Sequence, residues 1–124
     1  MATRRMTVSQ AIVEFLSHQY TVDGNHRERT IQGVFGIFGH GNVAGIGQAL
    51  KQLSVEDPSR MPYFQARNEQ AMVHESTAFS RMKRRRATFA CTASVGPGAT
   101  NMLTGAAVAT TNRLPVLLLP SDTF

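Results

Sequence analysis

Residues 33–42 read GVFGIFGHGN, an apolar run that ends in a glycine-rich loop. A short apolar run bounded by glycines is typical of a strand that is buried on both faces, so residues 33–38 predict a strand. Asn42 is predicted to cap the helix that follows. The apolar face of this helix is expected at Val43, Ile46, Leu50 and Leu53.

The same alternation continues on both sides of this stretch. Further strands are predicted at residues 61–66, 87–93 and 114–119, and helices at residues 8–20, after Asn68 and at residues 99–112. Alternation of helices and strands indicates a mostly parallel sheet with helices on both faces, a three-layer α/β/α domain. Few residues follow the last predicted strand, so we expect residues 1–124 to form one domain that is incomplete.

The ends and faces of two helices can also be predicted. Thr7 and Gln10 have the spacing of a capping box at the start of the first helix. Residues 23–25 read DGN, a turn signal. The helix after Asn68 is expected to end in a basic cluster at residues 81–86. Its apolar side is expected at Ala71, Met72, Ala78, Phe79 and Met82.

Composition excludes several classes of protein. The chain has 124 residues and one cysteine, so it has neither an internal disulfide nor a multi-cysteine zinc site. No stretch approaches the roughly 20 apolar residues of a membrane helix, and we expect a cytoplasmic protein. The net charge is +5, and most of the excess lies at residues 81–86. Without aromatic residues among these arginines, a solvated helix end is favoured over a nucleic-acid site, which would bind in a salt-dependent manner.

Three polar loops follow the predicted strands, at residues 39–42, 67–70 and 94–98. In open α/β sheets, ligands bind beyond the carboxyl ends of the strands, so we expect these loops to form one site. Glu69 is the carboxylate at this edge of the sheet and is therefore a candidate functional residue. A purely structural explanation is also available, because the helix dipole makes acidic residues common in first turns. Gly96-Pro97-Gly98 predicts a rigid turn with few side chains, and Asn101 lies just inside the next helix.

The other titratable residues carry less information. His40 lies between two glycines at the ligand edge, and His74 lies one helical turn after Gln70. His18 and His26 are expected at the surface, and Cys91 in the core. No cluster of metal ligands is apparent.

A dinucleotide-binding pattern is also present. Gly39, Gly41 and Ala44 match GxGxx(G/A), but the acidic residue expected at the end of the second strand is replaced by Ala66 and Arg67. A stand-alone nucleotide-binding α/β module therefore remains an alternative.

Two motifs together point to a family. Residues 67–70, RNEQ, with His74, and residues 94–101, SVGPGATN, resemble the pyrimidine-binding domain of thiamine-diphosphate enzymes of the acetolactate synthase type. Residues 36–43, 114–120 and 122–124 are similar to a branch of this family that hydrolyses a carbon–carbon bond of a cyclic diketone in inositol breakdown. An acetolactate synthase-like enzyme is the alternative within the family.

The resemblance implies roles for residues in all three loops. A glutamate at position 69 hydrogen-bonds a ring nitrogen of the cofactor's aminopyrimidine, which requires a carboxyl group sheltered from water. The residues implied to line the pyrimidine side are Gly96, Pro97, Gly98 and Asn101. The residues implied to face the thiazolium and substrate are His40 and Asn42, with Gln70 and His74 supporting Glu69.

The resemblance also implies parts that this chain lacks. Family members are several times longer, and a separate domain with a Gly-Asp-Gly motif holds the diphosphate and Mg²⁺. The chain has no Gly-Asp-Gly motif. We therefore expect an N-terminal pyrimidine-binding domain without the central and diphosphate-binding domains, inactive alone. The active site is expected at a subunit interface of a homo-oligomer that acts on a small molecule, with no nucleic acid or membrane as partner.

Overall fold

A parallel sheet of four strands forms the centre of the molecule. The computed structural model describes residues 3–37, 39 and 42–122. The strand order is β4-β3-β5-β6, and all three pairings are parallel. The strands are β3 (Ile31–Gly36), β4 (Tyr63–Gln65), β5 (Thr88–Ala93) and β6 (Leu117–Pro120).

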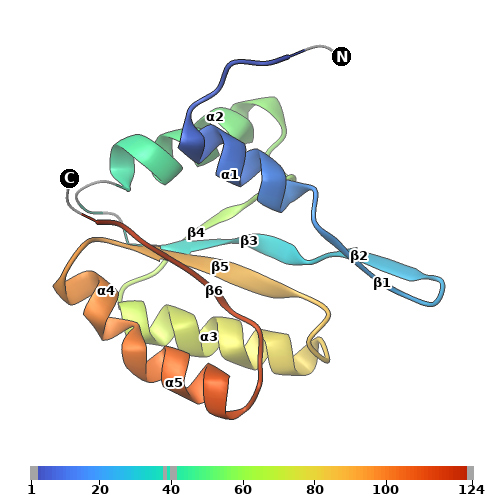
Figure 1. The fold of residues 1–124 in the computed structure, drawn as a ribbon, viewed down its shortest axis with the longest axis vertical. Coiled ribbons are helices and arrows are strands. Elements are labelled where there is room, and N and C mark those ends of the chain that lie inside the picture. Colours follow the sequence, from blue (N-terminus) through green and yellow to red (C-terminus); the bar gives the residue numbers. More distant parts are fainter. Residues whose placement is uncertain (1–2, 38, 40–41, 123–124) are drawn as a thin grey trace.

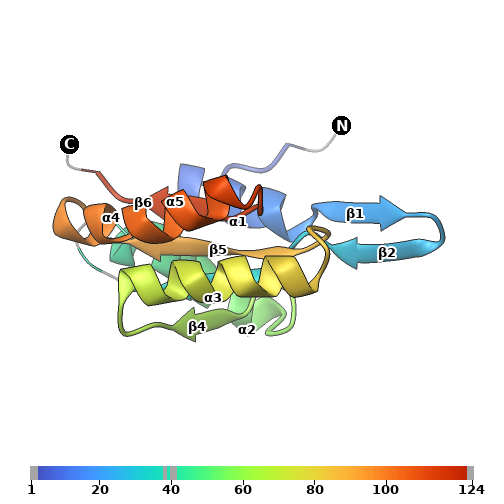
Figure 2. The same ribbon diagram turned by 90° about the horizontal axis from the view of Figure 1, so that it is seen from below.

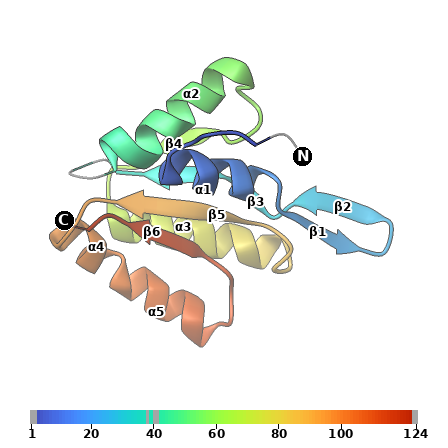
Figure 3. The ribbon, with the colours of Figure 1, turned by 45° about the horizontal axis from the view of Figure 1, so that its top comes forward.

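Helices cover both faces of the sheet (Figure 1, Figure 3). One face carries α1 (Val8–Ser17) and α2 (Gln48–Glu56); the other carries α3 (Glu69–Met82), α4 (Pro97–Asn101) and α5 (Leu103–Thr111). This confirms the predicted three-layer α/β/α architecture. No helix in the described ranges is long and apolar enough to cross a membrane.

Each face of the sheet has its own apolar core. The core under α1 and α2 is larger and includes Val13, Leu16, Ile31, Val34, Ile46, Leu50, Leu53 and Met61. The core under α3, α4 and α5 comprises Met72, Val73, Cys91, Ala93 and Met102. Because β3 and β5 contribute to both cores, they are buried on both faces, as the apolar run at residues 33–38 predicted.

The predicted capping box starts α1. The Thr7 hydroxyl accepts a hydrogen bond from the Gln10 backbone N–H (3.2 Å), and the Gln10 side chain accepts one from the Thr7 N–H (2.8 Å). The helix ends at Ser17, three residues before the predicted end, because Tyr20 begins a strand.

That strand belongs to a β-hairpin that the sequence analysis missed. β1 (Tyr20–Asp23) pairs antiparallel with β2 (His26–Arg29) around the predicted turn, where Gly24 has a φ of 58°. The hairpin projects beyond the amino ends of the sheet strands (Figure 1, Figure 2). β2 carries no apolar residue, and the only apolar side chains of β1, Tyr20 and Val22, are exposed, so the apolar pattern was too short to indicate a strand.

The buried side of α3 differs from the prediction. The buried residues are Met72, Val73, Ser76, Thr77 and Ser80, whereas Ala71 and Ala78 are exposed and Met82 is 83% exposed. Small hydroxyl side chains face β5 here, and the Ser76 hydroxyl donates to the Phe89 carbonyl (3.2 Å). Hydropathy misplaced this face because serine and threonine can be buried once hydrogen-bonded, as Ser76 and Thr77 are; Oγ of Ser80 is buried without a hydrogen-bond partner among the described residues.

Two other helices differ in their boundaries. The predicted helix at 99–112 begins at Pro97 and is divided at Met102, whose side chain is buried. The helix after Asn42 begins as a π-helix (Val43–Gly47) that continues into α2. Val43, predicted on its apolar face, is 57% exposed.

Candidate functional site

The carboxyl ends of β3, β4 and β5 meet at one edge of the sheet, as expected. A Cβ atom placed on Gly39 after β3 would lie 2.3 Å from Cβ of Ser94 after β5. A Cβ atom placed on Gly98 would lie 2.7 Å from Oγ of Ser94 and 3.4 Å from Oε1 of Glu69, which follows β4. The three loops are therefore in van der Waals contact, and their glycines are what allows it.

Glu69 is the first residue of α3 and is half-buried. The side chain of Asn68 caps the helix, as predicted, by accepting from the Ala71 N–H (3.0 Å). This cap fixes the direction in which the first turn leaves β4. Oε2 of Glu69 accepts a hydrogen bond from Nδ2 of Asn101 (2.8 Å).

The turn after β5 has the rigid form that the sequence predicted. Gly96 has φ 65° and ψ −118°, a conformation that favours glycine, and no atom lies within 4 Å of the position of its missing Cβ. Pro97 then occupies the first turn of α4. Both the N–H and the hydroxyl of Thr100 donate to the Gly96 carbonyl (2.8 and 2.9 Å), which holds the turn against the helix.

These elements surround an open hollow beside Glu69. Its lining residues are Glu69, Pro97, Gly98, Thr100 and Asn101. Four of these five were predicted as site residues. Thr100 was missed, although it lies in the quoted motif one helical turn after Gly96, a spacing that could have indicated it.

Gln70 and His74 pair with each other. Their Nε2 atoms are 3.2 Å apart, as the i,i+4 spacing allows, and both residues are half-buried. In the described residues, the hydrogen bond to the Glu69 carboxylate comes from Asn101. Support of Glu69 by Gln70 and His74 stays a prediction.

Asn42 does not cap a helix, which corrects the prediction. It has helical backbone angles, and its amide is turned into the sheet and buried. Nδ2 of Asn42 lies within hydrogen-bond distance of the Ala93 carbonyl (2.6 Å) and of Oγ1 of Thr92 (2.5 Å). The side chain thus ties the loop after β3 to the end of β5. A place for Asn42 facing the thiazolium and substrate stays a prediction. His40, predicted to line the site, lies outside the described residues.

The remaining candidates have structural roles. Burial raises the pKa of the Cys91 thiol to about 12, so this core residue is not a thiolate nucleophile at neutral pH. His18 and His26 are exposed, as predicted, and lie beside Glu14 and Glu28. Among the described residues there is no group of three or more histidine, cysteine, aspartate or glutamate side chains that could hold a metal ion.

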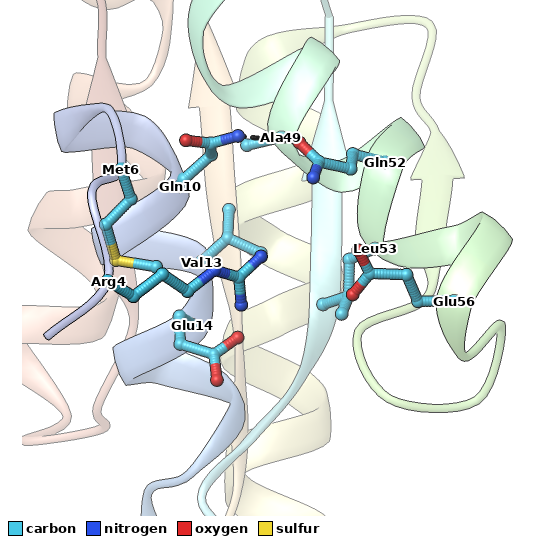
Figure 4. A pocket seen from close by; sticks show the side chains of 9 residues that line it. All are labelled: Arg4, Met6, Gln10, Val13, Glu14, Ala49, Gln52, Leu53 and Glu56. Carbon is cyan, nitrogen blue, oxygen red and sulfur yellow. Dashed lines mark hydrogen bonds between the residues drawn. The ribbon is translucent and has the colours of Figure 1, made fainter. Parts of the chain in front are cut away.

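A second hollow lies on the opposite face of the sheet, between α1 and α2 (Figure 4). Gln10 and Gln52 are hydrogen-bonded across it (2.6 Å), and Arg4 and Glu14 also line it. Its volume of about 20 Å³ is enough for about one water molecule. This hollow is therefore a gap between packed helices, and the site at Glu69 remains the candidate for catalysis.

Comparison with known proteins gives the class of this chain. Residues 6–123 match the family described as thiamine pyrophosphate enzyme, N-terminal TPP binding domain, and the chain belongs to this family. Thiamine pyrophosphate is another name for thiamine diphosphate. The match confirms the family-level resemblance seen in the two sequence motifs.

Individual relatives show which members of this family the chain is similar to. The 3D-(3,5/4)-trihydroxycyclohexane-1,2-dione hydrolases of Geobacillus thermodenitrificans and Clostridium tetani are each 51% identical to this chain over all 124 residues. The hydrolase of that name from Bacillus thuringiensis is 50% identical over the same length. The alignment covers 19% of each relative, so this chain spans about a fifth of their length.

The residues at the hollow fit the aminopyrimidine of thiamine diphosphate. Gly98 leaves free the space beside Oε1 of Glu69 that a Cβ would fill. No atom lies within 4 Å of the position of a Cβ on Gly96, and Pro97 adds an apolar side chain to the lining. Oε1 of Glu69, beside this glycine turn, can form a hydrogen bond with a ring nitrogen of a flat heterocycle.

Proposed function

We propose that this chain supplies the pyrimidine-binding part of a thiamine-diphosphate-dependent 3D-(3,5/4)-trihydroxycyclohexane-1,2-dione hydrolase. The overall reaction breaks one carbon–carbon bond of the cyclic dione and adds one water, giving the open-chain acid 5-deoxyglucuronate. Inositol breakdown is the proposed pathway and the cytoplasm the proposed location. The 51% identity to hydrolases of this name supports the choice of substrate.

The observation that carries the proposal is the carboxylate of Glu69 at the glycine turn. Oε2 is held by Asn101, while Oε1 faces the space above Gly98. When bound, thiamine diphosphate supplies the nucleophilic carbon and the electron sink that carbon–carbon cleavage needs. In this proposal Oε1 of Glu69 holds or accepts a proton at the aminopyrimidine ring nitrogen, and Gly96, Pro97 and Gly98 line one side of that ring.

The loop after β3 has a separate role in this proposal. We assign His40 to the thiazolium and substrate side of the site. Asn42 holds its loop in place through the buried hydrogen bonds to Thr92 and Ala93. Gln70 and His74 are proposed to support the first turn of α3, where Glu69 lies.

The remaining parts of the active site are proposed to lie outside these 124 residues. The diphosphate and Mg²⁺ would be bound by a diphosphate-binding domain of a partner subunit, in a homo-oligomer. In this chain the hollow is open on one side, so Glu69 is only half-buried. The partner subunit would also cover this open side. Shelter from water would then come from assembly.

A chimera tests the proposal. In it, this chain replaces the matching segment of the Geobacillus thermodenitrificans hydrolase. We expect consumption of the cyclic dione that depends on added thiamine diphosphate and Mg²⁺. Failure of the chimera to act on the dione, with the parent hydrolase active, would contradict the proposed substrate. Turnover of pyruvate instead would favour the acetolactate synthase alternative.

The Glu69→Gln substitution tests the central residue in the same chimera. We expect a fall in kcat of about 10²- to 10⁴-fold, the usual contribution of a general acid–base group, while thiamine diphosphate still binds. Glu75→Gln, an exposed position on the same helix, is the matched control and should leave kcat unchanged. Unchanged turnover in Glu69→Gln would remove the role given to this carboxylate.

A further inference from the structure

Asn101 joins two helices that are distant in sequence. Its Nδ2 donates to Oε2 of Glu69 across 32 positions of the chain, over 2.8 Å. Asn101 is the last residue of α4, which Gly96 and Pro97 start. Met102, the next residue, is anchored in the core with 2% of its surface exposed. The turn at Gly96 and Pro97 holds one end of the five-residue helix α4, and the buried Met102 side chain holds the other. Asn101 is thereby fixed in position.

The chemistry of the amide group limits what this contact can be. Nδ2 of an asparagine carries two hydrogens and can only donate. Oε2 of Glu69 must therefore act as an acceptor toward Asn101. A proton on the carboxyl group that is shared with a ligand then belongs on the other oxygen, Oε1, which faces the space above Gly98. Hydrogen bonds from a neutral donor to a carboxylate are also stronger than those between neutral groups.

We infer that Asn101 is a positioning residue that assigns different tasks to the two oxygens of Glu69. Oε2 is fixed by the asparagine amide, and Oε1 is left as the oxygen that exchanges the proton with the aminopyrimidine. This inference rests on the proposed function. It differs from a role of Asn101 as a direct ligand of the cofactor, because Asn101 acts through Glu69.

Within the described residues, nothing else holds the carboxylate in this way. The ion pairs found there do not include Glu69. Its geometry therefore depends on the direction of the α3 first turn, set by the Asn68 cap, and on Asn101. Loss of the amide leaves both oxygens free to rotate about the last bond of the side chain.

Two substitutions in the chimera test the inference. Asn101→Ala removes the donor, and a misplaced proton-transfer group should lower kcat by about 10- to 100-fold with little change in KM for the dione. Asn101→Asp keeps the shape but replaces the donor by a second carboxylate, so its loss should be at least as large. If Asn101 only filled space, Asn101→Asp, which keeps the shape of the side chain, would have the kcat of the parent chimera. This result would overturn the inference.

A double substitution separates coupling from independent damage. In a Glu69→Gln background, Asn101→Ala should cause no further loss of kcat, because the amide acts through the carboxylate. Additive losses would contradict the inference. Asn112→Asp, which introduces the same charge at the far end of α5, is the control and should keep wild-type kcat. Thermal unfolding of the Asn101 variants should stay within a few degrees of the parent, since Asn101 is only half-buried.

A readout without cofactor comes from the 124-residue chain itself. In nuclear magnetic resonance spectra, one side-chain amide proton of Asn101 should be shifted downfield by its carboxylate acceptor, and Glu69→Ala should abolish this shift. An Asn101 amide that is insensitive to Glu69→Ala would overturn the inference. A chimera in which Asn101→Ala has the parent rate while Glu69→Gln is inactive would overturn it too and leave the proposed function standing. Full activity of Glu69→Gln would overturn both.

Discussion

At the scale of single residues, Gly98 decides how closely a ligand can approach Glu69. The position is buried, and an added methyl group would lie 3.4 Å from Oε1 of Glu69 and 2.7 Å from Oγ of Ser94. The serine hydroxyl can rotate away, whereas the methyl group would remain in the space assigned to the aminopyrimidine.

Gly98→Ala should therefore affect binding more than folding. In the chimera we expect the Kd for thiamine diphosphate to rise by about tenfold or more, since overpacking costs about 1–3 kcal/mol. The melting temperature should change little, because alanine is favoured over glycine within a helix. Isothermal titration calorimetry measures the affinity, and an unchanged Kd would show that the ligand does not use this space.

The site also shows which residues a sequence can identify. Glu69 and the glycine turn could be named because their motifs are local, a carboxylate at a helix start and a Gly-Pro-Gly turn. Asn101 was named, but its bond to Glu69 could not be predicted, since it joins positions 32 residues apart. Asn42 was misassigned for the same reason, because its acceptors on β5 are 50 and 51 residues away.

At the scale of secondary-structure elements, the start of α1 depends on one reciprocal pair of hydrogen bonds. Thr7→Ala removes the hydroxyl that accepts from the Gln10 N–H. We expect the free energy of unfolding to fall by about 1 kcal/mol, the usual cost of losing a threonine cap. Urea denaturation measures this change. Thr104→Ala, at an exposed position inside α5, is the control and should not destabilise the chain.

The hairpin is joined to the end of α3 by charges. The Glu28 carboxylate accepts from Nζ of Lys83 (3.1 Å) and lies near Nε2 of His26 (3.2 Å) and Nε of Arg86 (3.4 Å). The hydrogen bond from Lys83 lowers the pKa of Glu28 below its ordinary value of 4.5, and burial opposes this shift only in part. Two residues of the basic cluster, Lys83 and Arg86, are therefore ion-paired with the hairpin, whereas the sequence predicted a solvated helix end.

The stability that Glu28 contributes should depend on pH with a definite sign. Because its pKa is lower in the folded state, the contribution is present above about pH 4.5 and is lost as the pH falls through the folded-state pKa. Glu28→Gln should lower the free energy of unfolding by about 0.5–1 kcal/mol at pH 7. In urea denaturation, the difference from wild type should shrink as the pH is lowered below about 4.5. The exposed Glu56→Gln is the control, and a difference independent of pH would contradict the assignment.

At the scale of the whole molecule, α5 packs onto α3 through a glycine. A Cβ atom on Gly105 would lie 2.6 Å from both Cβ and Cγ1 of Val73, which is fully buried. The two helices can approach this closely only because Gly105 has no side chain. The same approach keeps α4, which carries Asn101, beside the start of α3.

Gly105→Ala should destabilise the fold by about 1–3 kcal/mol, in spite of the higher helix propensity of alanine. Val73→Ala removes Cγ1, one of the two clashing atoms, and keeps Cβ, so the double variant should be less destabilised than the sum of the two single variants. Urea denaturation of the three variants measures this coupling. Val108→Ala, on a more exposed side of α5, should change stability by less than about 0.5 kcal/mol, and strict additivity at positions 73 and 105 would contradict the packing argument.

The amino-acid sequence was enough to predict the alternation of helices and strands, the parallel sheet, the capping box of α1 and the glutamate at the carboxyl edge. These features depend on local patterns of apolar residues, caps and glycines, which act within a few positions of the chain. The buried face of α3, the hairpin and the partners of Asn42 and Asn101 became apparent only in the folded chain. The physical reason is that serine faces, polar strands and side-chain amides become favourable only when hydrogen-bond partners from distant segments are brought against them.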